Sequence, residues 1–365
     1  MATAQQPPRL DKLAHGAIAK YLKQIAAYKK PVLADNDPEN LHQMRVGLRR
    51  LRTAVQVFDA GIDLPKAGQE PKIAAVGRKL GKLRDLDVVG MTLRDRYAPD
   101  LPDTEQQCLD VVLQYLAQQR HKTLRQVKKL LKGKRYDKLQ QSLTEWVAKP
   151  DYAAIAPLTA HQVIPDLVLP LVSQLWLHPG WLVGTKTTRS GLTVNPRISQ
   201  SATDALIADQ GPVLHSLRKQ VKRVRYQLRL VSNLYPSTLD DDIERLSAMQ
   251  DTLGDLQDST VLEAFLGNVL PDAKAHMPTL FALLADRRHR AWQQWQMHQQ
   301  HYLDQAQRQH LRLAILNPAN PAPEQKKTVE AVAATKSKHS SAAKVASPKV
   351  TTQKSASVLE NPSAE

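Results

Sequence analysis

The chain has 365 residues, a formal net charge of +16 and a single cysteine, Cys108. The excess of positive charge favours encounters with polyanions, although it says nothing about the fold. One cysteine excludes an intramolecular disulfide, so a reducing compartment is expected. Residues 1–10 lack the apolar core of a signal peptide, and no run of about 20 apolar residues occurs. We therefore expect a cytoplasmic protein that does not cross a membrane.

The composition favours helices over strands. Aromatic residues make up 5% of the chain, only 14 glycines occur, and Leu, Ala, Gln, Lys and Arg are frequent. An all-α fold is therefore predicted, with helices separated at prolines and glycines. In chain order the expected helices are 11–29, 38–60, 70–97, 104–132, 135–148, 166–177, 203–209, 212–234, 238–268 and 276–316.

An internal repeat emerges when the chain is compared with itself. The segment His42–Arg52 matches His215–Arg225, and Leu80–Asp85 matches Leu253–Asp258, both at an offset of 173 residues. Two motifs at one offset predict a duplication that gives two related helical halves. The expected organisation is a flexible N-terminus at 1–10, a first half at 11–150, a connecting insert at 151–202, a second half at 203–316 and a disordered tail at 317–365.

The first copy of the repeated helix carries a basic stripe beside an apolar stripe. His42, Arg45, Arg49 and Arg52 fall on one arc of the helix, next to the apolar residues that face the core. No acidic residue occurs between positions 41 and 58 to neutralise these charges from within the helix.

The second copy repeats the arrangement, and no Asp or Glu occurs between positions 212 and 239. A third basic helix, 120–135, again lacks acids. Like charges one turn apart repel by about 0.2–0.5 kcal/mol per pair, so an anion or another part of the fold is needed to neutralise these stripes. A solvated basic face is the alternative for any single stripe. The stripe of the second copy consists of His215, Arg218, Lys222, Arg225 and Arg229.

Two repeated pairs of polar residues have a functional and a structural interpretation. His42 and His215 are placed either to donate to an anion or to cap the start of a helix. Asp85 and Asp258 are expected to pair with the basic stripes and hold them in register. Two aspartates also suggest a metal, but each stands alone in its half, so the structural role is preferred.

Gly81 and Gly254 lie inside helical patterns, where glycine costs about 1 kcal/mol relative to alanine. Close helix packing would explain both. No Walker A, dinucleotide-binding, Gly-x-Ser-x-Gly, His-Glu-x-x-His or Cys-x-x-Cys motif occurs, and the acidic residues are not clustered as catalytic Mg²⁺ requires. A non-enzymatic protein without a metal or cofactor is therefore expected.

The two His-containing basic helices resemble the CHAD domain, the conserved histidine α-helical domain family, over about residues 10–315. The resemblance implies two pseudo-symmetric four-helix bundles with a basic groove or cavity between them. It also implies binding of inorganic polyphosphate and association with polyphosphate granules. The residues that carry the match are His42, Arg45, Arg49, Arg50, Arg52, His215, Arg218, Lys222, Arg223, Arg225 and Tyr226.

Polyphosphate binding is thus the leading hypothesis, with other polyanions as further candidates. A nucleic-acid-binding protein is one alternative, although Tyr226 is the only aromatic residue in the two stripes and single-stranded recognition uses stacking aromatics. A scaffold for an acidic partner protein is another. By motif position the resemblance adds Lys82, Arg84, Arg125, Lys129, Arg287 and Arg290. The remaining candidate contact is Lys219, beside Arg218.

Overall fold

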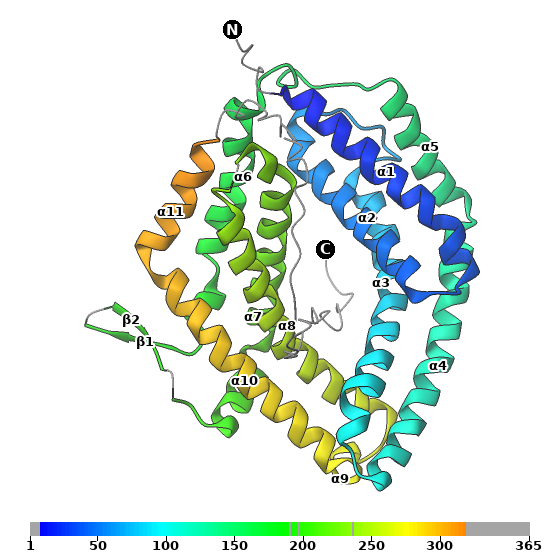
Figure 1. Cartoon of the computed structure of the whole chain (residues 1–365), viewed down its shortest axis with the longest axis vertical. Coiled ribbons are helices and arrows are strands. Elements are labelled where there is room, and N and C mark those ends of the chain that lie inside the picture. The colour runs from blue at the N-terminus through cyan, green and yellow to red at the C-terminus, as the bar shows by residue number, and fades with distance from the viewer. Residues whose placement is uncertain (1–7, 190, 196, 236, 319–365) are drawn as a thin grey trace, which may run out of the picture.

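The structure is a computed structural model that describes residues 8–189, 191–195, 197–235 and 237–318. Helices make up most of it (Figure 1), so the all-α prediction is confirmed. The expected flexible N-terminus and disordered tail fall largely on residues outside these ranges. The α-helices are α1 (Leu10–Ala34), α2 (Pro38–Phe58), α3 (Glu70–Thr92), α4 (Asp103–Leu131), α5 (Lys134–Ala148), α6 (Ala160–Trp176), α7 (Gln200–Val231), α8 (Asp240–Val269), α9 (Ala273–His276), α10 (Pro278–Leu303) and α11 (Gln305–Leu316).

Pro31, which was expected to separate two helices, and Pro212, which was expected to begin one, both lie inside helices. Helix α1 continues through Pro31 and ends at Asp35, whose φ of 61° is left-handed. Helix α7 runs through Pro212, which joins the two helices expected at 203–209 and 212–234. An internal proline removes a backbone hydrogen bond and costs about 3 kcal/mol. The neighbouring Val32 and Leu214 are buried, and burial of apolar side chains contributes in the opposite direction. Conversely, the single helix expected at 276–316 is divided at Asp304 into α10 and α11.

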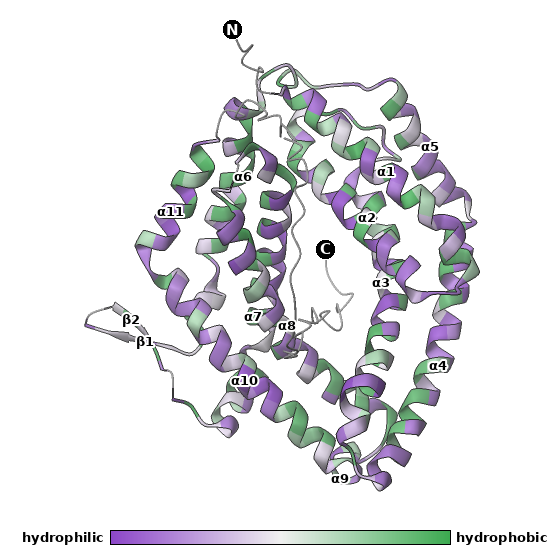
Figure 2. Cartoon of the chain, viewed as in Figure 1, coloured by the Kyte–Doolittle hydropathy of each residue, from purple (hydrophilic) through white to green (hydrophobic). Residues whose placement is uncertain are grey.

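The first half of the chain packs as successive neighbours, with α1 against α2, α2 against α3 and α3 against α4. The core face of α2 is the apolar stripe beside its basic residues, from Leu41 to Val55, and both of these residues are buried. Each long helix carries hydrophobic and hydrophilic residues side by side (Figure 2), as amphipathic helices of a bundle do. Burial of the apolar stripe therefore fixes the direction in which the basic stripe points.

The second half packs α7 against α8 and α10, and α8 against α10. The insert belongs to this core, because α6 packs on α7 and α11 and buries Trp176 and Trp181. The Trp181 ring stacks on Trp295 with 5.5 Å between centroids. The insert also forms a short antiparallel hairpin, β1 (Thr185–Thr188) and β2 (Gly191–Val194), which the sequence pattern did not predict.

The two halves meet at two places. At the first, α2 contacts α7. At the α9 end (Figure 1), a separate hydrophobic cluster combines Val88 and Leu93 with Leu266 from the second half. There Glu105 of α4 accepts hydrogen bonds from the backbone amides of Thr279 (2.8 Å) and Leu280 (3.0 Å), at the start of α10. A carboxylate in this position is favoured by the helix dipole. The origin of the halves by duplication stays a prediction.

Candidate polyanion-binding cavity

A cavity of about 500 Å³ lies between α2 and α3 of the first half and α7 and α8 of the second. Two carboxylates, Asp85 and Asp251, belong to its lining. Six basic side chains also line it, and they come from both halves of the chain. These are Arg45, Arg49, Arg52, Arg84, Lys222 and Arg225, and His42 lies beside them.

Helical periodicity explains why the basic residues face one space. Positions three and four residues apart lie on the same side of a helix, so Arg45, Arg49 and Arg52 project together from α2. Lys222 and Arg225 do so from α7. Because α2 contacts α7, the two stripes converge on one cavity.

Asp85 of α3 approaches the stripe of α2, as expected. Its Oδ1 lies 3.9 Å from Nη1 of Arg45, and both side chains are mostly buried. Its counterpart Asp258 is also buried. The pairing of Asp258 with the second stripe stays a prediction. In the second half Nε of Arg218 donates to the backbone carbonyl of Gln250 at 3.4 Å.

Tyr226 of α7 connects the two stripes. The guanidinium carbons of Arg49 and Arg225 each lie 4.5 Å from the centre of its ring. Such cation–π contacts contribute about 0.5–2 kcal/mol, more where water is excluded. An aromatic ring of the second half therefore holds one arginine from each half at the wall of the cavity.

The equivalent arginines Arg52 and Arg225 have different partners. Arg52 forms an ion pair with Glu70 at the start of α3. Arg225 instead donates to two neutral groups, Oε1 of Gln250 at 3.1 Å and Oγ of Ser247 at 3.2 Å. These hydrogen bonds orient the guanidinium of Arg225 without neutralising it.

The electrostatics of the cavity disfavour further positive charge. Burial lowers the pKa of Lys222 well below its ordinary value, and Arg49, Arg218 and Arg45 lower it further. Burial also lowers the pKa of Arg49, although an arginine stays protonated. Burial and the neighbouring cations lower the pKa of His215 to about 4. A bound anion would relieve the repulsion that these shifts report.

Several donors at the cavity have no protein acceptor. The Nε atoms of Arg49 and Arg84 are buried and form no hydrogen bond within the described residues. An unpaired buried donor costs about 1–3 kcal/mol. Nδ1 of His215 is likewise buried without a hydrogen-bond partner within the described residues. A phosphate oxygen is the kind of acceptor that would satisfy such groups.

Nine of the candidate contacts are at or beside the cavity. Besides the lining residues His42, Arg45, Arg49, Arg52, Arg84, Lys222 and Arg225, these include Arg218, which is buried against α8, and His215, which lies close to Lys222.

Eight candidates are exposed and do not line the cavity. On α2 and α7 they lie on the outer faces of helices whose inner faces line it. On α4, Arg125 and Lys129 are exposed, whereas Leu124, Val127 and Leu131 of the same helix are buried. The exposed residues are Arg50, Lys82, Arg125, Lys129, Lys219, Arg223, Arg229 and Arg290.

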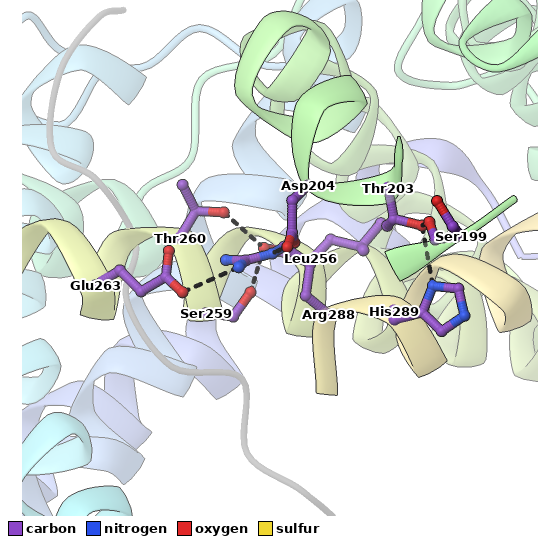
Figure 3. Close-up of polar contacts among 9 residues, drawn as sticks. All are labelled: Ser199, Thr203, Asp204, Leu256, Ser259, Thr260, Glu263, Arg288 and His289. Atoms are coloured by element: carbon purple, nitrogen blue, oxygen red, sulfur yellow. Dashed lines mark hydrogen bonds and ion pairs between the residues drawn. The ribbon is translucent and has the colours of Figure 1, made fainter. Parts of the chain in front are cut away.

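The arginines of α10 are occupied by carboxylates. Arg287 is buried, with its Nη2 2.5 Å from Asp255, and Arg290 pairs with Asp286 one turn earlier. Arg288 is bound by two carboxylates (Figure 3), of Asp204 on α7 at 2.7 Å and Glu263 on α8 at 2.9 Å. Its role is to join three helices. The resemblance suggested Arg287 and Arg290 by motif position. The partner of Arg287, Asp255, lies on another helix, whereas the partner of Arg290, Asp286, lies one turn earlier on α10.

Besides Asp85 and the apolar residues of the lining, the residues that were not among the candidates are Tyr226, Ser247, Gln250 and Asp251. The sequence offered a signal only for Tyr226, the aromatic residue inside the second basic stripe. The other three lie on α8, within two helical turns before the Leu-Gly-x-Leu-x-Asp motif. Their positions depend on how α8 packs against α7.

Two negative findings apply to the described part of the chain. None of its helices combines the length and hydrophobicity needed to cross a bilayer. It also contains no group of three or more His, Cys, Asp or Glu side chains arranged to hold a metal ion.

The mainly helical fold, with a basic cavity between its two halves, defines the class of protein as an α-helical polyanion-binding domain. Residues 16–267 match the model of the CHAD domain, and the chain belongs to this family. Among solved structures it is similar to PptA from Streptomyces chartreusis, with 14% identity, a TM-score of 0.58, and coverage of 80% of this chain and 99% of that one. The CHAD domain from the plant Ricinus communis has 22% identity and a TM-score of 0.49, with 88% and 97% covered. No curated protein matches the chain.

Proposed function

We propose that this protein binds inorganic polyphosphate in the cavity between its halves and acts as a binding protein rather than an enzyme, at polyphosphate granules in the cytoplasm. The observation that carries the proposal is the imbalance of charge in the cavity, where six basic side chains face two carboxylates. The CHAD family is associated with polyphosphate binding. The unpaired Nε donors of Arg49 and Arg84 supply hydrogen bonds that a row of phosphate groups would accept.

The lining suits a polyanion without bases. Tyr226 is the one aromatic residue among the lining residues, and Arg49 and Arg225 already contact its ring. A nucleobase that stacked on this ring would have to compete with two arginines. Arginine forks bind phosphate oxygens in pairs, and the linear polyphosphate chain presents such oxygens at every unit.

The test compares two triple variants of α7 that remove the same charge. Replacing Arg218, Lys222 and Arg225 with alanine removes three cations at the cavity. The matched control replaces Lys219, Arg223 and Arg229, which are exposed on the same helix. Charge-assisted hydrogen bonds contribute about 1.5–3 kcal/mol each. The cavity variant should therefore lose at least about a hundredfold in affinity for long-chain polyphosphate.

The exposed variant should lose only the smaller part that comes from long-range attraction. Equal losses in the two variants would show that overall charge, not the cavity, binds the ligand. Circular dichroism and melting curves establish that both variants are folded. Single-stranded DNA of equal charge, at an ionic strength of about 0.15 M, is the comparison ligand. Equal affinity for DNA and polyphosphate would overturn the proposal.

A further inference from the structure

A second concentration of positive charge lies on α4 and α5, outside the cavity. Between Asp110 and Asp137 the chain contains no acidic residue. None of the exposed cations of this segment lines the cavity. In Figure 1, α5 and the end of α4 that leads into it lie at one edge of the molecule, away from α7. The exposed cations form an outer basic surface, which consists of Lys122, Arg125, Lys129, Lys132, Lys134 and Arg135.

Helical periodicity turns the cations of α4 away from the bundle. The apolar residues Leu124, Val127 and Leu131 are buried in the core. The cations recur at spacings of three and four residues and therefore share the opposite face of the helix. At a rise of 1.5 Å per residue, the row from Lys122 to Lys132 is about 15 Å long. Such a row suits an extended anion better than a single ion.

The carboxylates closest to this surface are bound to other cations. Asp35 and Asp87 both pair with Arg120, at 2.8 and 2.7 Å. Asp137 lies 2.9 Å from Nζ of Lys29. Within the described residues, no cation of the outer basic surface forms an ion pair. The charge of this surface is therefore not neutralised by the described part of the chain.

The junction of α4 and α5 adds to the repulsion. Lys134 and Arg135 lie in the first turn of α5, and the N-cap residue Gly133 supplies no side chain to cap it. The helix dipole is positive at this end, so it disfavours cations and favours anions. An anion bound along the surface would relieve the repulsion among the side chains and the opposing effect of the dipole.

The surface offers charge but neither a stacking platform nor an apolar face. Tyr136, the aromatic residue next to Arg135, is buried, whereas bases of single strands stack on accessible rings. The leucines of this part of α4 pack in the core, whereas a helix that lies in a lipid interface presents its apolar side chains to the bilayer. A flexible polyanion without bases fits these features best.

We propose that the outer basic surface is a second polyanion-binding site, through which one protein molecule holds a second polyphosphate chain and so cross-links long chains. That the ligand is polyphosphate rests on the proposed function. The surface is exposed and the cavity is enclosed by helices, so salt should weaken binding at the surface more than binding in the cavity. The surface is therefore the weaker of the two sites.

The experiment counts binding sites on the full chain by isothermal titration with short-chain polyphosphate at low salt. The wild type should show a tight site and a weaker site, and added salt should remove the weaker one first. The test variant replaces Lys122, Arg125 and Lys129 with glutamine, which is a good helix former, and should keep only the tight site. A single site in the wild type, or two sites in the folded test variant, would overturn the proposal.

A matched control removes the same charge from the exposed face of α1 and should keep both sites. Loss of the weaker site in this control would show that overall charge, and not the outer basic surface, binds the second chain. Tighter binding of duplex DNA than of polyphosphate at the weaker site would identify a nucleic-acid interface instead and would also overturn the proposal. The control replaces Lys12, Lys20 and Lys23 with glutamine.

Light scattering with long-chain polyphosphate tests the cross-linking. The wild type should form large assemblies, and the α4 variant should lose them because it keeps one site. Cross-linking by the α4 variant equal to that of the wild type would refute the second site and leave the cavity standing. If the cavity variant of Arg218, Lys222 and Arg225 instead keeps the tight site, the proposed function fails while the outer basic surface stands.

Discussion

Arg218 lies directly against Gly254, so that a Cβ atom at the glycine would stand 3.0 Å from Nη2 and 3.3 Å from Nε of the arginine. Arg45 has the same relation to Gly81, where a Cβ would stand 3.5 Å from Nη2. Both pairs belong to the repeated motifs. Close packing does explain these glycines, but the group that approaches each one is a guanidinium.

Replacing Gly254 with alanine should displace Arg218 and weaken polyphosphate binding. A Cβ near 3.0 Å requires the buried guanidinium to shift by a few tenths of an ångström, and we expect that shift to disturb its hydrogen bond to the Gln250 carbonyl. Alanine is favoured over glycine in a helix by about 1 kcal/mol, so the variant should remain folded. Isothermal titration with polyphosphate measures the loss.

Gly267→Ala on the same helix is the control, because nothing lies within 4 Å of its added Cβ. It should raise the melting temperature and leave affinity unchanged. If Gly254→Ala binds polyphosphate as tightly as the wild type, the placement of Arg218 is not important for binding.

The sequence predicted the face of each basic helix but not the partners of each arginine. Helical periodicity alone places Arg45, Arg49 and Arg52 together, because the apolar stripe of α2 must face the core. Arg52 pairs with Glu70 of α3, whereas Arg225 has neutral partners on α8. The difference depends on which side chain of α3 or α8 lies opposite each arginine. Such pairs join separate helices, and one-dimensional spacing does not determine how those helices are packed.

The same limit applied to the outer basic residues. The spacing of α4 resembled that of α2, yet Arg125 is exposed and no residue of α4 lines the cavity. The basic residue of α4 that does contact other helices is Arg120, which binds Asp35 and Asp87. Both carboxylates are distant in sequence, so only the folded chain reveals that this charge is neutralised.

Tyr226 should matter for binding through its ring and not its hydroxyl. Phenylalanine keeps the π face that Arg49 and Arg225 contact, whereas leucine removes it. Loss of about 1 kcal/mol of cation–π stabilisation corresponds to roughly fivefold weaker binding. We expect Tyr226→Phe to bind polyphosphate like the wild type and Tyr226→Leu to bind more weakly, as measured by titration at fixed salt. Equal affinities for the two variants would exclude a role for the ring.

His215 should make the folded state sensitive to acid. Burial, followed by Lys219, Arg218 and Lys222, lowers its pKa from 6.5 to about 4. Between these values the unfolded chain binds a proton that the folded chain does not, so the free energy of unfolding falls as pH falls. The contribution is complete above the unfolded pKa and is lost as pH falls toward the folded pKa.

Urea unfolding at several pH values measures this effect. His215→Gln should be less acid-sensitive than the wild type, because glutamine does not titrate. His121→Gln, an exposed substitution on α4, should keep the wild-type pH dependence. Identical pH profiles for His215→Gln and the wild type would show that this histidine titrates alike in both states.

Asp85 should make polyphosphate binding tighter as pH falls toward 6. Burial raises its pKa to about 6, against the opposing effect of Arg45, Lys222, Arg84 and Arg218. Protonation removes a negative charge from the cavity lining, so an anion is held more strongly by the same cations. Titrations between pH 8 and pH 6 should therefore show rising affinity. Near pH 6 the protein should take up protons on binding, so the measured heat should depend on the buffer.

Asp85→Asn should bind more tightly than the wild type at pH 8 and show a weaker dependence on pH. Asp110→Asn, exposed on α4, should behave as the wild type does. A wild-type pH dependence in Asp85→Asn would mean that another group, and not this carboxylate, couples proton binding to the polyanion.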